Sequence, residues 1–164
     1  MSSSPQSPTP YGFTSDVDHI MAVMQSAFDP AWGEAWNRRQ VEDALTFPTT
    51  HSLLMDADGN DPVHSGKLAA GFVLTRYVAG EEELLLIAVT PQLRRQGIGR
   101  KLIDQMKINA KQRGAERIFL EMRHNNPAEK LYRQVGFEPI GKRPDYYLAA
   151  DGVRLDAITF GLSV

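Results

Sequence analysis

The residues that most clearly suggest a chemical role are two glycines that follow a pair of arginines. Gly97 and Gly99 lie in the segment 93–100, which joins a continuous apolar run to a stretch of helical periodicity. Glycine allows a positive φ and lets a ligand approach the backbone without meeting a Cβ. The first turn of a helix presents unpaired N–H groups with a partial positive charge. The segment therefore favours a phosphate site.

This turn matches neither of two familiar nucleotide motifs. The dinucleotide pattern G-x-G-x-x-G and the triphosphate pattern G-x-x-x-x-G-K-[ST] are both absent. Glycines at the start of a helix also serve close packing alone, so the rest of the sequence must decide between the two interpretations.

The elements that position this turn follow from the spacing of apolar residues. We expect two helices, an antiparallel run of strands, and then alternating strands and helices that end in a hairpin. The strand before the glycines is almost entirely apolar and is expected to be covered on both faces. The order predicts an α/β (α+β) fold around one mixed central sheet. The expected helices are 15–28, 34–46, 97–113 and 127–136, and the expected strands are 51–57, 68–78, 82–89, 117–122, 137–141, 146–149 and 153–162.

Length and composition restrict the class of protein. The chain has 164 residues, of which 42% are hydrophobic, and no cysteine. We expect a flexible Ser/Pro-rich tail at 1–13 and one soluble domain at 14–164. The missing cysteines exclude thiolate zinc sites, iron–sulfur clusters and a cysteine nucleophile. No apolar run approaches the ~20 residues of a membrane span, and no secretory signal is found, so no membrane partner and a cytoplasmic location are expected.

Charge is divided unequally along the chain. Residues 1–83 carry 12 acidic and 4 basic side chains, whereas residues 84–164 carry 8 acidic and 14 basic ones. The two halves are therefore expected to face partners of different charge. The formal net charge of −2 and the short basic stretch at 94–113 argue against nucleic acid. The four histidines lack metal-ligand spacing, so no metal site is expected.

Several motifs occur together in the order typical of one family. Residues 94–99 read Arg-x-x-Gly-x-Gly and follow a strand that ends at Val89. Downstream, residues 125–137 read Asn-x-x-Ala-x-x-Leu-Tyr-x-x-x-Gly-Phe. Over about residues 14–162 the chain resembles the GNAT family of acetyl-CoA-dependent N-acetyltransferases. The resemblance implies a mixed, splayed sheet flanked by about four helices, with acetyl-CoA as cosubstrate.

The resemblance also implies which groups bind the coenzyme. The turn and the helix start would hold the pyrophosphate through backbone N–H groups, and the preceding strand would pair its backbone with the pantetheine amides. The Val89 N–H would also donate to the thioester oxygen. The side chains of that strand are expected in the core. The implied coenzyme-binding residues are Ile87, Ala88, Val89, Arg94, Arg95, Gln96, Gly97, Ile98, Gly99, Arg100, Asn125 and Tyr132.

Acetyl transfer to an amine requires a neutral amine and a proton for the leaving thiolate. Glu121, at the end of a short strand, is the candidate base, acting directly or through water. Tyr132 is the candidate acid, because a phenol of pKa ~10 can share a proton with a thiol of pKa ~8.5. From position alone, Glu121 would be a solvated or ion-paired carboxylate and Tyr132 a core residue.

Within the family, the chain resembles the RimI branch, the ribosomal-protein-alanine N-acetyltransferases. The segments that carry this resemblance are 28–36, 120–123, 146–147 and 152–158. In that branch a Glu and a Tyr at the positions of Glu121 and Tyr132 serve as base and acid. The spacing from this Glu to the motif Asn is one residue shorter here, so either Asn125 or Asn126 fills the Asn position.

The family places the acceptor against the first two helices and the final hairpin. The acidic first half of the chain would attract a cationic protein segment there. We therefore expect acetylation of the N-terminal α-amine of an alanine-starting small-subunit ribosomal protein, whose basic N-terminus is the partner. The alternatives are a small-molecule amine as acceptor, or a non-catalytic acyl-CoA-binding sensor. Trp32 and Trp36 either shape the acceptor groove or belong to the core.

Overall fold

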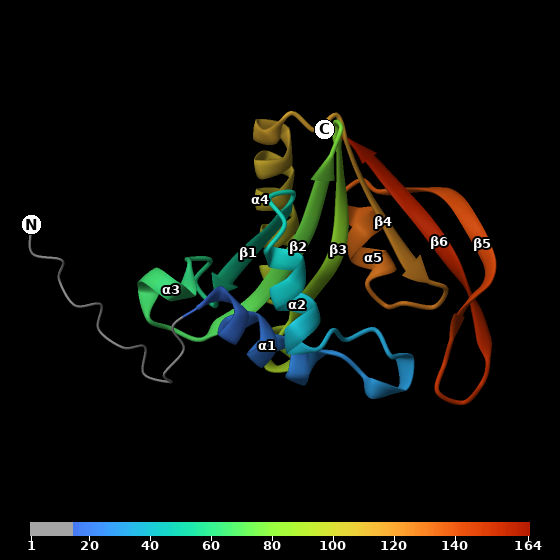
Figure 1. The fold of residues 1–164 in the computed structure, drawn as a ribbon, viewed down its shortest axis with the longest axis horizontal. Helices are drawn as coiled ribbons and strands as arrows, with labels where there is room; N and C mark the ends of the chain where they lie inside the picture. The colour runs from blue at the N-terminus through green and yellow to red at the C-terminus, as the bar shows by residue number, and fades with distance from the viewer. Residues whose placement is uncertain (1–14) are drawn as a thin grey trace, which may run out of the picture.

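The computed structural model describes residues 15–164, whose strands form a six-stranded sheet with helices on both faces (Figure 1). The strand order is β1-β2-β3-β4-β6-β5, antiparallel except between β3 and β4. The expected α/β (α+β) class with a mixed central sheet is confirmed. The expected tail at 1–13 lies outside the described residues. The strands are β1 Thr50–Asp56, β2 Ala69–Val78, β3 Glu81–Val89, β4 Arg117–Arg123, β5 Glu138–Leu148 and β6 Arg154–Ser163.

The helices begin where capping groups satisfy their first N–H groups. Ser15 caps α1 as its spacing predicts. The predicted start of α2 at residue 34 is wrong, because Asn37 and Gln40 form a capping box that starts the helix at Arg38. The helices are α1 Asp16–Ala27, α2 Arg38–Leu45, α3 Pro62–Ser65, α4 Ile98–Arg113 and α5 Glu129–Gln134, with short 3₁₀ turns η1 Pro30–Trp32 and η2 Pro91–Leu93.

Two other helix boundaries differ from the prediction. The single turn of α3 was not predicted; Asp61 caps it and Gly66, in the left-handed conformation, ends it. The last helix, α5, begins at Glu129 rather than at residue 127. The Asn126 side chain accepts a hydrogen bond from the Ala128 N–H, which holds the preceding residues in a turn.

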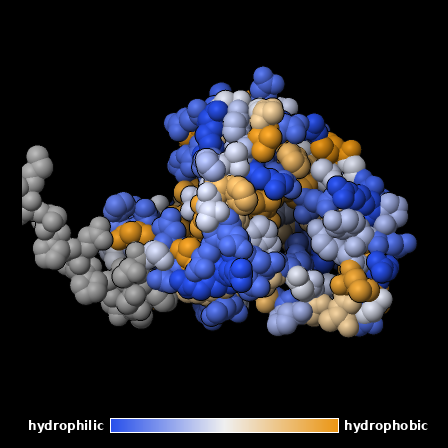
Figure 2. Space-filling view, viewed as in Figure 1, coloured by the Kyte–Doolittle hydropathy of each residue, from blue (hydrophilic) through white to orange (hydrophobic). Residues whose placement is uncertain are grey.

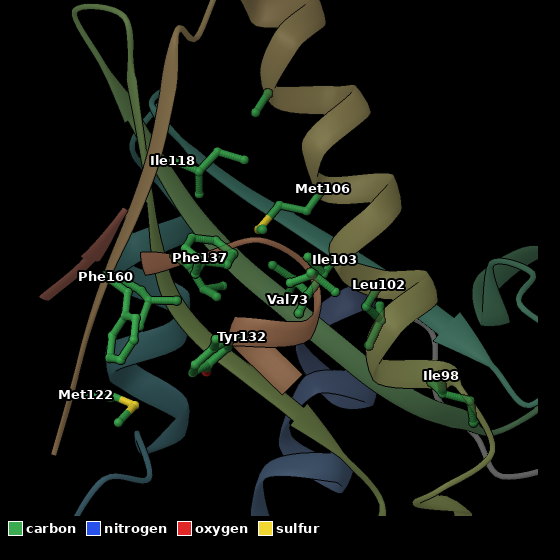
Figure 3. Close-up of a cluster of buried hydrophobic side chains, with 14 of the residues drawn as sticks. Val73, Ile98, Leu102, Ile103, Met106, Ile118, Met122, Tyr132, Phe137 and Phe160 are labelled. Carbon is green, nitrogen blue, oxygen red and sulfur yellow. The ribbon is translucent and has the colours of Figure 1, made fainter. Parts of the chain in front are cut away.

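The sheet carries an apolar cluster on each face. Helices α4 and α5 cover one cluster, and α1 and α2 cover the other (Figure 1). Strand β3 contributes to both, because its register against β2 shifts after Leu74 and places Leu84 on the α4 face and Leu86 on the α1 face. The strand is thus covered on both faces, as its apolar run predicts. Figure 3 shows the α4-face cluster, with Tyr132 among its residues.

Strands β3 and β4 separate after a short stretch of pairing. Residues 81–84 of β3 pair with residues 117–120 of β4, and the pairing ends there. On their outer sides both strands remain paired, β3 with β2 as far as Val89 and β4 with β6 as far as Arg123. The separation therefore leaves a gap whose edges are two backbones without a strand between them.

The last two strands form a long hairpin. Strand β5 is continuous over Glu138–Leu148, where the sequence predicts a strand at 137–141 and a separate arm at 146–149. Gly141 and Pro144 are typical of a break, but here the register against β6 shifts twice and the strand continues past both residues.

Candidate active site

The gap between β3 and β4 opens into a groove of about 770 Å³. Its walls come from β3, the turn before α4, the end of β4, α5, and the loop between α1 and α2. In Figure 2 the surface is hollowed right of centre, between the body of the molecule and the β5–β6 hairpin. Of the predicted site residues, Gln96 and Asn125 lie outside the wall. Those in the wall are Ile87, Ala88, Val89, Arg94, Arg95, Gly97, Ile98, Gly99, Arg100, Glu121 and Tyr132.

Alternating hydrogen bonds along β3 turn two of its residues toward the groove. The Thr90 N–H donates to the Ala70 C=O of the neighbouring chain segment at 2.8 Å. In an antiparallel pair every second residue bonds to the partner strand. Ala88 therefore faces β2 with its backbone, whereas Ile87 and Val89 direct their N–H and C=O groups toward the gap. Ile87 and Val89, the two residues whose backbone was expected to pair with the pantetheine amides, thus face the groove with these groups.

The turn before α4 is fixed by one arginine and two unusual backbone conformations. The Arg94 guanidinium donates to the Val89 C=O at 3.1 Å and to the Ala27 C=O at 2.9 Å, so it ties the end of β3 to the end of α1. Arg95 and Gly97 have φ of +65° and +81°. Arg94 is therefore engaged with protein carbonyls, while the side chain of Arg95 remains exposed at the mouth of the groove.

Helix α4 begins without a side-chain cap. Its N-cap residue, Gly97, offers no side chain to bond the first N–H groups. A Cβ at Gly97 would meet nothing within 4 Å, so its positive φ is what requires glycine. A Cβ at Gly99 would lie 3.0 Å from Cδ2 of Leu131, so this glycine allows α4 and α5 to pack closely. Gly97 thus serves the backbone conformation of the turn and Gly99 serves helix packing, the two roles that the sequence left open.

Tyr132 lies on α5 at the border between core and groove. Its side chain packs edge-on against Phe137, with ring centroids 5.9 Å apart, yet it also lines the groove. In Figure 3 its hydroxyl oxygen lies at the end of the ring away from Phe137. Burial, followed by the nearby Glu34 carboxylate, raises the pKa of Tyr132 above its ordinary value. The phenol therefore keeps its proton at neutral pH.

Glu121 lies at the end of β4 with 22% of its side chain exposed. Its Oε2 is 3.2 Å from Nε of Arg143, which is 62% exposed, so this ion pair is open to water and weak. Asn126 lines the groove, with its Oδ1 2.9 Å from the Ala128 nitrogen. Asn125 is exposed, with φ of +67°. Of the two candidate asparagines, the structure brings Asn126 to the groove.

The remaining wall comes from the loop between α1 and α2. Trp32 and Glu34 line the groove there. Arg123 of β4 places its Nε 2.6 Å from Oε1 of Glu34 and its guanidinium 3.9 Å from the Trp32 ring centroid. The Ala150 N–H of the hairpin donates to the Ala31 C=O of the same loop at 3.0 Å. Three segments distant in the sequence therefore meet at this end.

Sequence reasoning assigned no role to Glu34, Arg123 or Tyr147. Tyr147 is half-buried, and burial, followed by two nearby carboxylates, raises its pKa to about 12. No local spacing relates these residues; the available signal was that all three lie in the segments that resemble the RimI branch. Of the two tryptophans, Trp32 lines the groove, whereas Trp36 packs against the α1-face cluster.

Known proteins share both the sequence pattern and the fold. The profile of the Acetyltransferase (GNAT) family matches residues 19–137. The ribosomal protein bS18-alanine N-acetyltransferase of Escherichia coli (strain K12) is 33% identical over 153 residues, covering 92% of this chain and 93% of that protein. The crystal structure of the ribosomal-protein-S18-alanine N-acetyltransferase from Escherichia coli aligns with a TM-score of 0.75 and 29% identity, covering 93% of this chain and 90% of the other. An aminoglycoside 6′-N-acetyltransferase complexed with coenzyme A shares the fold, with a TM-score of 0.69, 16% identity, and 90% and 89% of the two chains covered.

The family-model match and the 33% identical relative show that this chain, with its splayed sheet and groove, belongs to the Acetyltransferase (GNAT) family of N-acetyltransferases. The resemblance to the RimI branch is confirmed by these relatives. The protein is therefore an acyltransferase of a family that uses acetyl-CoA. No helix in the described part of the chain is long and apolar enough to cross a membrane. Residues 15–164 hold no cluster of His, Asp and Glu suited to a metal ion.

Proposed function

We propose that this enzyme acetylates the N-terminal α-amine of a small-subunit ribosomal protein that begins with alanine, in the cytoplasm, with acetyl-CoA as donor. A 33% identical relative carries this activity, on bS18, in its name. The observation that carries the proposal is the composition of the groove: backbone N–H groups at one end, and charged and aromatic side chains from three segments at the other. A coenzyme and an amine require these two kinds of surface.

The coenzyme end of the groove fits acetyl-CoA. The unpaired N–H groups at the start of α4 suit a pyrophosphate, and the exposed Arg95 and Arg100 add positive charge beside them. Ile87 and Val89 offer backbone donors and acceptors to an extended chain of amides, as in the addition of a strand. When bound, acetyl-CoA supplies the acetyl group as a thioester.

Two groups would stabilise the negative charge and supply the proton during acyl transfer. The Val89 N–H faces the groove and can donate to a carbonyl oxygen on which negative charge develops. The Tyr132 hydroxyl keeps its proton, because burial raises its pKa, and it can therefore donate to a departing thiolate. Neither role requires a metal ion.

Glu121, which lines the groove, would remove a proton from the acceptor amine, directly or through water. An α-amine has an ordinary pKa of ~8, so at neutral pH a carboxylate needs to assist only a modest deprotonation. A lysine side chain, with an ordinary pKa of ~10.4, would require a stronger base. The weak pairing of Glu121 with Arg143 leaves the carboxylate accessible. These features favour an α-amine acceptor.

An acceptor panel tests this proposal. Release of free CoA from acetyl-CoA would be measured with alanine-starting basic peptides, with the same peptides blocked at the N-terminus but carrying free lysines, and with small amines such as aminoglycosides. We expect turnover only with the free alanine terminus. Turnover confined to small amines would show that the acceptor is a small molecule rather than a protein N-terminus. CoA binding without turnover on any acceptor would indicate an acyl-CoA sensor.

A further inference from the structure

A second carboxylate, Glu34, lies in the groove wall on the acceptor side. It belongs to the loop between η1 and α2, and 23% of its side chain is exposed. Its Oε1 accepts a hydrogen bond from Nε of Arg123 at 2.6 Å. Its other oxygen, Oε2, has no hydrogen-bond partner among residues 15–164. One oxygen is thus anchored while the other can accept a further donor.

The partner of Glu34 is itself fixed. The Arg123 side chain is only 7% exposed, and its guanidinium lies over the Trp32 ring at 3.9 Å. Its backbone pairs with Ala157 of β6, inside the sheet. A loop carboxylate would ordinarily be mobile, but this one is held by a buried arginine on a strand. Removing the charge of Glu34 alone would leave that arginine without its counter-ion.

Glu34 and Glu121 differ in their effect on the proposed acid, Tyr132. The Glu34 carboxylate contributes, after burial, to the raised pKa of both Tyr132 and Tyr147. Glu121 contributes to that of Tyr147 and is paired with the exposed Arg143. The two carboxylates therefore lie on the same part of the groove, with Glu34 the one that acts on Tyr132.

We propose that the Glu34 carboxylate, anchored by Arg123, binds the protonated α-amine of the incoming protein N-terminus and positions it beside Tyr132 and Glu121. A free terminus is an ammonium group with three donors, and a fixed carboxylate oxygen in a partly water-excluded groove is its natural acceptor. Glu34 is thus a positioning and specificity residue, separate from the proton acceptor Glu121. The inference rests on the proposed function, because it names the recognition element for that substrate.

Binding to the enzyme–CoA complex tests this without turnover. Titration calorimetry would compare an alanine-starting basic peptide with its des-amino analogue, in which hydrogen replaces the terminal amine. For the native enzyme at pH 7 we expect about tenfold tighter binding of the amine peptide, the value of a charge-assisted hydrogen bond. In Glu34→Gln the amide oxygen still accepts from Arg123, the charge is lost, and the ratio should fall to about one.

Kinetics separate positioning from a merely structural effect. Glu34→Gln should raise the KM for the acceptor peptide about tenfold while changing the KM for acetyl-CoA little. Glu42→Gln is the matched control, since Glu42 is an exposed carboxylate on α2 that also pairs with an arginine, Arg38. It should change neither constant. A Glu34→Gln enzyme that keeps the tenfold preference for the amine peptide would overturn the inference.

The pH dependence of peptide binding to the native enzyme provides a second test, which does not depend on whether Glu34→Gln folds. The preference for the amine peptide should disappear as the pH rises through the ordinary α-amine pKa of ~8, because the ammonium loses its charge. A preference that persists unchanged above that pH contradicts binding of the charged form. If neither peptide binds the native enzyme–CoA complex, the proposed function itself fails.

Discussion

The proposed coenzyme wall of the groove, at residues 87–100, and its proposed acceptor wall are built in different ways. The coenzyme wall is made of backbone groups within one stretch of sequence, from Ile87 to Arg100, and its geometry comes from a strand edge, a turn and a helix start. The acceptor wall is made of side chains, such as Trp32, Glu34 and Arg123, from segments distant in sequence. Backbone recognition tolerates many side chains, whereas the side-chain wall depends on particular residues.

This contrast explains why a shared fold does not fix the acceptor. An aminoglycoside 6′-N-acetyltransferase has the same fold at 16% identity. We expect selectivity to lie in the acceptor wall, because its side chains would contact the amine. Substitutions in the two walls should accordingly change different kinetic constants, and the predictions below are ordered by the size of the expected effect.

The largest effect is expected where the two walls meet. Tyr132→Phe removes the hydroxyl that would protonate the leaving thiolate while keeping the ring packed against Phe137. General acid catalysis contributes about 10²- to 10⁴-fold, so kcat should fall by that order. The affinity for acetyl-CoA, measured by calorimetry, should change less than about twofold, since only the hydroxyl is lost. Unchanged turnover would remove Tyr132 from the chemistry.

A smaller, pH-dependent loss is expected at Glu121. In Glu121→Gln the acceptor amine has no carboxylate to take its proton, so kcat/KM should fall about 10- to 100-fold near pH 7. The loss should shrink as the pH rises, because more of the amine is already neutral. Rate profiles from pH 6 to 9 provide the check, with Glu42→Gln as a control. An equal loss at every pH would indicate positioning instead of proton removal.

A substitution that only strains the backbone of the coenzyme wall should weaken the binding of acetyl-CoA. Gly97→Ala forces a Cβ onto a residue with φ of +81°, which costs about 1–2 kcal/mol, so the KM for acetyl-CoA should rise about tenfold without a change in acceptor preference. Gly152→Ala is a matched control in the β5–β6 turn, with φ of +86° and nothing within 4 Å of the added Cβ. It should lower thermal stability similarly and leave the KM unchanged; a similar KM increase in both would contradict the assignment.

The native enzyme should not lose activity at alkaline pH through deprotonation of Tyr132, its proposed acid. Because burial raises the pKa of Tyr132 above its ordinary value, the phenol stays in its protonated, donating form as the pH increases. The value of kcat/KM should increase up to about pH 8, where the α-amine becomes neutral, and remain level to about pH 10. A decline between these values, measured by CoA release, would show that the acid loses its proton within that range.

The elements that form the proposed coenzyme wall were easier to predict from the sequence than the contacts of the proposed acceptor wall, for a physical reason. A strand, a glycine turn and a helix start are local patterns, so spacing predicts the elements that hold Val89, Gly97 and Gly99, whereas the family resemblance implies their role. The contact between Glu34 and Arg123 joins residues 89 positions apart and depends on how the sheet splays. No periodicity encodes such a pair.

The same distinction holds for the elements themselves. Long, strongly periodic helices such as α4 were predicted nearly to the residue. The start of α2 was misplaced because a side-chain capping box, not apolar spacing, sets it. The interruption predicted in β5 is bridged by shifts in its pairing with β6, which only the partner strand can provide.

Mass spectrometry of a purified small-subunit ribosomal protein that begins with alanine, after incubation with the enzyme and acetyl-CoA, tests the central claim most directly. The account predicts a single acetyl group on the terminal alanine nitrogen, none on lysine side chains, and almost none with Tyr132→Phe. Acetylation restricted to lysines, or full modification by the Tyr132→Phe enzyme, would contradict it.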